Sequence, residues 1–273
     1  MAHKNKENLS PYKARNQLRK ALPETAVLKS SNRGVHKRPE TIYSADEAND
    51  RLADIFRNHD FECSHELRIK LAQFYEILMK NQEHQNFTRL LKLRDVAIKH
   101  FIDCLIVPQL VKLKFPLLDV GTGPGFPGIP LKLYYPNEKI LLAEGVQKRV
   151  EFLKTVREQM DLKNCDIIGR NINPYFEYPV NGVITRAVED IKNTLTNTLS
   201  CLQVGGEVYL MKGPGVDPEI EIARKHFDGV FDLVMNKAYT LPKTGHDRRL
   251  VVFKKVKATP LPEDEDNDIL LKD

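Results

Sequence analysis

The sequence has little cysteine and no long apolar run. Its 273 residues include 4 cysteines, which stand far apart in the chain (Cys63, Cys104, Cys165 and Cys201). This spacing excludes a Cys-x-x-Cys metal or redox site and argues against a disulfide framework, so we expect a reducing cytoplasm as the compartment. No apolar stretch approaches the ~18 residues of a membrane span. The first ten residues also lack the apolar core of a signal peptide. We therefore expect no membrane partner.

Patterns of metal ligands are also missing. His59, Cys63 and His65 are close in sequence, but no second pair of ligands with zinc spacing follows them. His65 and Glu66 lack the second histidine of a His-Glu-x-x-His site, because Ile69 stands at that position. The sequence predicts no metal site.

Charge is concentrated at the two ends of a chain that is 41% hydrophobic and 29% charged. Residues 1–40 hold ten Lys and Arg against three Glu, and residues 263–273 hold six acids against one Lys. We expect residues 1–43 to form a disordered basic arm and residues 258–273 an acidic tail. The arm suggests a polyanionic partner such as nucleic acid; a solvated tail without a partner fits the composition equally well, and a transit peptide less well.

Residues 44–112 have a helical pattern. Ser44 and Glu47 form a capping-box pattern that predicts a helix start. Ser64 precedes a longer helix with apolar residues at helical spacing, and a third helix is predicted from about Asp95 to Val107. This helical N-terminal region is either a separate domain or a cap on the remainder of the chain.

Short strand-like runs and helix-like stretches alternate over residues 113–257. Five apolar runs are separated by helical patterns, which predicts βαβ units and a mostly parallel sheet covered on both faces. Residues 231–239 and 249–256 are two further strands joined by a short loop, so we expect an antiparallel hairpin. The predicted fold class is α/β, a doubly wound, seven-stranded, mostly parallel sheet with an N-terminal helical extension.

A glycine-rich turn follows the first of these strands. The segment from Leu117 to Gly128 reads LLDVGTGPGFPG, an apolar strand that ends in Asp119 and leads through glycines into a helix. Such a turn lets a ligand approach the backbone closely at the carboxyl edge of the sheet. A dinucleotide-binding G-x-G-x-x-G motif would need glycine at position 126, where Phe126 stands. Glu144, at the end of the second strand, is placed to accept hydrogen bonds from both hydroxyls of a bound ribose.

Several motifs in order give a specific resemblance. They are DVGTGPGFPGIPL at 119–131, Asn86-Phe87-Thr88, KHFIDCL at 99–105, KRVEFL at 148–153, Thr185-Arg186-Ala187, LMKG at 210–213 and RRLVV at 248–252. Together they resemble the bacterial small-subunit ribosomal RNA guanine-N7 methyltransferase family, known as RsmG or GidB. The resemblance implies a class I, Rossmann-like methyltransferase domain at residues 113–257 with S-adenosylmethionine as cofactor. It also implies ribosomal RNA or the small ribosomal subunit as partner, and we expect a monomer.

The resemblance also implies site residues. The expected cofactor-binding residues are Asp119, Gly121, Thr122, Gly123, Gly125, Phe126, Glu144, Asn171, Ile172 and Arg186. The expected RNA-binding residues are Asn86, Thr88, Lys99, His100, Lys148, Arg149, Lys212, Arg248 and Arg249. Arg186 and Lys212 are expected to position the substrate base, with no residue assigned a role in bond making.

Two positions depart from the family pattern. An acid is usual where Ile172 stands, and an arginine is usual where Leu91 stands. An RNA-binding or ribosome-assembly protein with lost or altered activity on the same fold is therefore the alternative function.

Methylation at guanine N7 removes no proton before attack, so the reaction needs positioning and electrostatics rather than a general base. The sequence accordingly offers no obvious acid–base pair.

Overall fold

The first helix begins where the capping box predicts. The computed structural model describes residues 38–82, 85–186 and 188–259, and most of the basic arm and of the acidic tail lies outside these residues. Helix α2 (Ala45–Asn58) starts after Ser44, whose Oγ accepts the Glu47 N–H at 3.3 Å. The Glu47 carboxylate accepts the Ser44 N–H at 3.0 Å in return. Two main-chain donors that the helix leaves unpaired are thus satisfied locally.

The third predicted helix is interrupted. Helix α3 (His65–Gln82) is continuous, whereas the next helical stretch consists of α4 (Leu93–Val96), the π-helical turn η2 (Ala97–Ile102), α5 (Asp103–Leu105) and α6 (Val107–Leu110). A π-helical turn is wider than an α-helical one and occurs frequently at functional sites. Here it carries Lys99 and His100, two of the residues that the resemblance singled out.

The sheet has seven strands, as the sequence predicts. Their order is β3-β2-β1-β4-β5-β7-β6, with the first five parallel and β7 antiparallel to both β5 and β6. Their bounds are β1 Leu117–Val120, β2 Ile140–Ala143, β3 Cys165–Ile168, β4 Val180–Arg186, β5 Leu202–Lys212, β6 Phe231–Thr240 and β7 Asp247–Lys255. The predicted doubly wound fold and its closing hairpin are confirmed.

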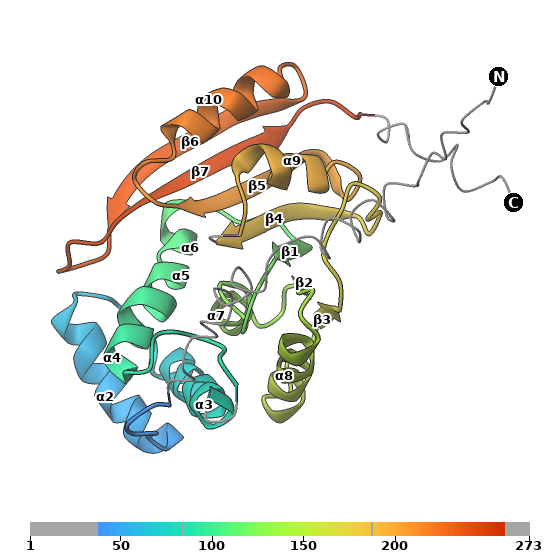
Figure 1. Ribbon diagram of the computed structural model, residues 1–273. Coiled ribbons are helices and arrows are strands. Elements are labelled where there is room, and N and C mark those ends of the chain that lie inside the picture. Colours follow the sequence, from blue (N-terminus) through green and yellow to red (C-terminus); the bar gives the residue numbers. More distant parts are fainter. Residues whose placement is uncertain (1–37, 83–84, 187, 260–273) are drawn as a thin grey trace, which may run out of the picture. The chain divides into compact units, whose positions relative to one another are not determined.

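Two apolar cores cover the two faces of the sheet. Alternate strand residues point to opposite faces, so Leu117 and Ile140 join one core and Leu118 and Leu141 the other. The first core contains the N-terminal helices together with α7 (Gly128–Tyr134) and α8 (Gln147–Gln159). The second contains α9 (Ile191–Asn197) and α10 (Asp217–His226), which lie on the other side of the strands in Figure 1. The N-terminal helices therefore pack on the same face as α7 and α8.

The strand order reverses between β1 and β4. The chain moves outward from β1 to β2 and β3, then returns to pair β4 with the other side of β1. In open α/β sheets, ligands bind in the crevice outside the carboxyl ends of the strands at such a reversal. The fold thus places a binding site where β1 ends in the glycine turn and β4 ends at Arg186.

Candidate active site

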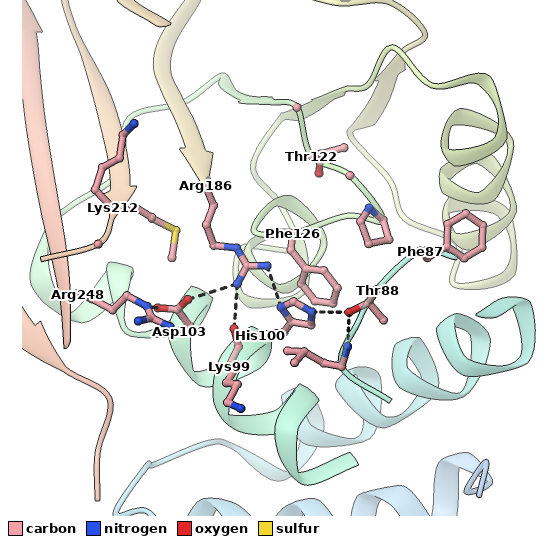
Figure 2. A pocket seen from close by; sticks show the side chains of 16 residues that line it. Phe87, Thr88, Lys99, His100, Asp103, Thr122, Phe126, Arg186, Lys212 and Arg248 are labelled. Atoms are coloured by element: carbon pink, nitrogen blue, oxygen red, sulfur yellow. Dashed lines mark hydrogen bonds and ion pairs between the residues drawn. The ribbon is translucent and has the colours of Figure 1, made fainter. Parts of the chain in front are cut away.

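A cavity of about 450 Å³ opens at the carboxyl ends of β1, β4 and β5 (Figure 2). The glycine turn after β1 and the ends of β4 and β5 form one part of its wall, and the N-terminal helical region forms another. The lining residues are Phe87, Thr88, Leu90, Lys99, His100, Asp103, Gly121, Thr122, Gly123, Pro124, Phe126, Arg186, Met211, Lys212, Gly213 and Arg248. Residues as far apart in sequence as Phe87 and Arg248 thus share one site.

Arg186 is held by three groups of the interrupted helix. Its Nη1 donates to the Lys99 carbonyl at 3.0 Å and lies 3.3 Å from the Asp103 carboxylate. Its Nη2 lies 2.8 Å from His100 Nδ1. The Arg186 side chain is 16% exposed and that of Asp103 only 4%. These contacts fix the guanidinium in the cavity wall, as Figure 2 shows.

Asp103 is the counter-ion of two arginines. Besides Arg186, it lies 3.5 Å from Arg248 Nε, and the Tyr239 hydroxyl donates to it at 3.4 Å. Burial, followed by the nearby carboxylate of Asp103, raises the pKa of Tyr239, so the phenol keeps the proton that it donates. The two cations and the carboxylate form a compact cluster beside the cavity, in which one carboxylate serves two arginines and one positive charge is left over.

His100 lies between Arg186 and Thr88. Its ring stacks on Phe126, with centroids 4.1 Å apart and an angle of 16° between the planes. Its Nε2 lies 3.1 Å from Thr88 Oγ1. Burial and the Arg186 guanidinium lower the pKa of His100 well below 6.5, so the ring is neutral at physiological pH.

Lys212 lies in the cavity wall but is already engaged. Its Nζ lies 2.9 Å from the Glu219 carboxylate of α10 and donates to the Glu189 carbonyl. The Lys212 side chain is 10% exposed. The ammonium therefore has a fixed position and a counter-ion.

Asp119 holds the glycine turn in place. It is fully buried, and its Oδ2 accepts the N–H of Gly128, the first residue of α7, at 2.7 Å. Burial raises the pKa of Asp119 to about 7, against the hydrogen bond from Gly128 that lowers it. Its contact with the start of α7 makes Asp119 a support of the turn.

The glycines of the turn serve different purposes. Gly125 has φ +104°, and a Cβ there would lie 2.4 Å from the Ile129 side chain of α7. A Cβ on Gly121 would meet Val188 at 2.7 Å. Gly123 has φ +60°, lines the cavity and has open space where a Cβ would stand. Of these three, Gly123 is the glycine that leaves room for a ligand on the cavity side.

Glu144 supports the same turn from the end of β2. Its carboxylate accepts the N–H of Gly123 at 3.0 Å and that of Val146 at 2.8 Å, and it lies 3.5 Å from Arg149. A carboxylate can accept about four hydrogen bonds, so Oε1, which accepts from Val146, keeps capacity for one more donor, whereas Oε2 faces both Gly123 and Arg149. This carboxylate and the open space at Gly123 fit a cofactor that carries a ribose.

The structure brings about half of the expected site residues into the cavity wall. Those that line it are Thr88, Lys99, His100, Gly121, Thr122, Gly123, Phe126, Arg186, Lys212 and Arg248. Those that lie outside its lining are Asn86, Asp119, Gly125, Glu144, Lys148, Arg149, Asn171, Ile172 and Arg249.

Some of these outer residues have clear structural partners. Ile172 is buried in the second core, and the Asn171 side chain lies against Gly145, where a Cβ would meet it at 2.1 Å. Arg249 pairs with Asp217 at 2.7 Å.

The sequence patterns gave no role to Asp103 or Tyr239, which hold the arginines in place. An acid inside the apolar stretch from Phe101 to Leu105 was the available signal for Asp103, since a buried carboxylate needs a charged partner. Tyr239 carries no comparable signal.

Among the described residues, no three His, Cys, Asp or Glu lie close enough to hold a metal ion. None of the described helices is long and apolar enough to cross a membrane.

Comparisons with known proteins agree with the motifs. The family model described as rRNA small subunit methyltransferase G matches residues 68–251. "Ribosomal RNA small subunit methyltransferase G 2" of Bdellovibrio bacteriovorus is 65% identical over 241 residues, which is 88% of this chain and 94% of the relative. "Ribosomal RNA small subunit methyltransferase G" of Mycoplasma capricolum is 34% identical over 206 residues, 74% of this chain and 89% of the relative. Among solved structures, TrmN from Thermus thermophilus matches 57% of this chain and 48% of its own, with a TM-score of 0.46 and 17% identity.

The resemblance inferred from the ordered motifs is thereby confirmed, and with it the enzyme class and S-adenosylmethionine as cofactor. The chain belongs to the rRNA small subunit methyltransferase G family.

Proposed function

We propose that the cavity receives a guanine of small-subunit ribosomal RNA and that the protein methylates N7 of this base. One observation carries the proposal. The cavity lining has two groups able to act as a base, and both are already engaged: Asp103 by two arginines and His100 Nδ1 by Arg186. Guanine N7 is an acceptor with an exposed lone pair, so its methylation needs no base. An exocyclic amine or a ribose hydroxyl must lose a proton, which this cavity is poorly equipped to accept.

The charge distribution of the cavity suits the product. N7 methylation makes the guanine ring cationic. Arg186 and Arg248 share the carboxylate of Asp103, and Lys212 is paired with Glu219. Because each of these cations faces a carboxylate, they can position the substrate with reduced repulsion of the developing charge.

We assign the cofactor to the glycine turn and the end of β2. Gly121, Thr122, Gly123 and Phe126 would hold its methionine part and sulfonium, and Glu144 would accept the ribose hydroxyls. Asn171 and the main chain of Ile172 would flank the adenine, while Asp119 and Gly125 keep the turn in shape. When bound, S-adenosylmethionine supplies an activated methyl group. The protein's own share is to place the base in line with that group.

We assign the RNA contact to the cavity mouth and to a basic path defined by Arg51, Lys92, Arg94 and Lys99. Lys99 lines both the active-site cavity and an adjoining one, and Lys92 and Arg94 line both that second cavity and a third that includes Arg51. Lys99 pairs with Asp95 at 2.9 Å, whereas Lys92 and Arg94 are exposed and form no ion pair within the described part of the chain. Exposed cations in a row suit the phosphates of an RNA strand.

Asn86, Thr88, His100 and Arg248 belong to the same proposed RNA surface at the cavity mouth. Lys212 belongs to the same surface from within the cavity wall. Lys148, Arg149 and Arg249 lie outside the cavity lining, and we assign them to RNA that extends beyond it. We further infer a monomer that acts in the cytoplasm. In support of a reducing compartment, all four cysteines are unpaired thiols. Light scattering tests the monomer by measuring the molar mass in solution, which should match the 31.3 kDa of one chain.

The test of the reaction uses the lability of the product. Borohydride and aniline cleave RNA at 7-methylguanosine because the cationic ring opens. Primer extension on treated small-subunit rRNA, from cells with and without the gene, should give one stop that depends on the gene. If the patterns are identical while the purified protein transfers methyl groups to an amine or a ribose, the guanine-N7 assignment is wrong.

A further inference from the structure

Thr88 is held rigidly at the wall of the active-site cavity. It lies after α3 in a loop whose Phe87 and Thr88 N–H groups both donate to the buried side chain of Gln82, at 2.8 and 3.0 Å. The Phe87 ring packs on Phe152 of α8, with centroids 4.5 Å apart. Since Thr88 lines the cavity, its hydroxyl group has a defined position relative to anything bound there (Figure 2).

The hydrogen bonds of His100 fix the position of its proton. A guanidinium can only donate, so Arg186 Nη2, 2.8 Å away, requires a lone pair on His100 Nδ1. The neutral ring must then carry its hydrogen on Nε2. That hydrogen points to Thr88 Oγ1 at 3.1 Å, so the imidazole donates to the hydroxyl.

The Thr88 oxygen consequently has no acceptor capacity left. A hydroxyl oxygen has two lone pairs. One is taken by His100 Nε2–H and the other by the N–H of Leu90, at 3.0 Å. The hydroxyl hydrogen is left over, and it meets no acceptor within residues 38–82, 85–186 and 188–259. Thr88 is thus a group that donates into the cavity and accepts nothing from it.

We propose that the Thr88 hydroxyl donates to O6 of the target base and thereby selects guanine over adenine; this rests on the proposed guanine-N7 methylation. N7 and O6 lie next to each other on the same edge of guanine, so a base that offers N7 to the methyl group brings O6 alongside. Adenine carries an amino group at that place, which is a donor. Two donors would face each other and leave a polar group unpaired, which sites of this kind reject strongly.

The experiment compares Thr88→Val, which keeps the shape of the side chain and removes the hydroxyl, with Thr88→Ser, which keeps the hydroxyl. Each protein methylates a small-subunit rRNA fragment that carries either guanine or 2-aminopurine at the mapped nucleotide, with labelled S-adenosylmethionine in single turnover. 2-Aminopurine keeps N7 and lacks O6. Thr155→Val on α8 is the matched control, because this half-buried side chain lies outside the cavity lining and its hydroxyl donates only to the Glu151 carbonyl of its own helix among the described residues.

On guanine, Thr88→Val should be slower by roughly 10-fold to 100-fold, the cost of one unmade hydrogen bond in a desolvated site. Thr88→Ser should stay within a few-fold of the wild type, and Thr155→Val should be unchanged. On 2-aminopurine, the wild type should fall to the rate of Thr88→Val, and Thr88→Val should lose nothing further.

Two results overturn the assignment of Thr88. One is a Thr88→Val protein that methylates guanine at the wild-type rate. The other is a Thr88→Val protein that is slower than the wild type by the same factor on guanine and on 2-aminopurine, which would indicate a structural role for the side chain. A wild-type protein that forms no 7-methylguanosine in any rRNA refutes the proposed function instead, so the two failures are distinguishable.

Discussion

Asp103→Asn tests the cluster that shapes the active-site cavity. The substitution keeps the size of the side chain and removes its negative charge. Arg186 and Arg248, which lie 3.3 and 3.5 Å from the carboxylate, then lose their shared counter-ion. We expect lower stability and lower methylation activity, because Arg186 is the most buried cation of the cluster and no longer has a charged partner.

Burial sets the magnitude of the effect. Removing one partner of a buried ion pair costs ~3–5 kcal/mol of folding free energy, because the other charge stays buried without a partner. Arg186 keeps its contacts with the Lys99 carbonyl and His100, and Arg248 is 27% exposed, which lowers the cost. We therefore expect a loss of about 2–4 kcal/mol. For a chain of this size, that corresponds to a fall in melting temperature of roughly 5–15 °C.

Thermal and urea unfolding of the full chain measure this loss. Asp54→Asn is the matched control, since it breaks the ion pair with Arg57 at 3.0 Å, whose side chains are 69% and 75% exposed. An exposed pair contributes under ~1 kcal/mol, so the control should melt close to the wild type. Equal small losses for both variants would refute the view that Asp103 is a buried counter-ion.

Three further predictions concern the turn, the cofactor and the RNA. The pKa of Asp119 is raised to about 7, so the folded state keeps a proton that the unfolded state loses near pH ~4. The stability that this bound proton contributes is therefore lost as the pH rises through about 7. Asp119→Asn should therefore gain stability relative to the wild type between pH ~4 and ~7 in urea titrations. Glu144→Gln should weaken S-adenosylhomocysteine binding about 10-fold by calorimetry, and unchanged affinity would place the ribose elsewhere. Reversing charge at Lys92 and Arg94 should lower the salt slope of RNA binding by about 1.4, whereas Lys225→Glu on α10 should leave it unchanged.

The fold was accessible from the sequence because its signals are local. Strands β1 and β2 read as short apolar runs, and alternate residues enter opposite cores. The capping box at Ser44 is likewise a pattern of four residues. The interruption of the helix around His100 was missed, because its apolar spacing is the same as that of a regular helix.

The glycine turn shows where local reading stops. The pattern correctly indicates a turn after β1, but the purpose of each glycine depends on neighbours that the pattern does not contain. Both Gly123 and Gly125 have a positive φ, but only at Gly125 would a Cβ meet Ile129, whereas Gly123 has open space on the cavity side. Tertiary packing decides between glycines that look equivalent in the sequence.

The position of Arg186 links the N-terminal helices to the chemistry at the sheet. Arg186 ends β4, yet all the polar side-chain and main-chain groups that hold its guanidinium come from residues 99–103. Arg186 in turn fixes the tautomer of His100, and the same helical stretch brings Asp103 to Arg248. The sheet alone would supply the glycine turn and a free arginine. The helical N-terminal region turns that arginine into a fixed donor and makes Thr88 a group that reads one edge of the base. In this protein the catalytic cavity is therefore completed by the segment that precedes the methyltransferase sheet.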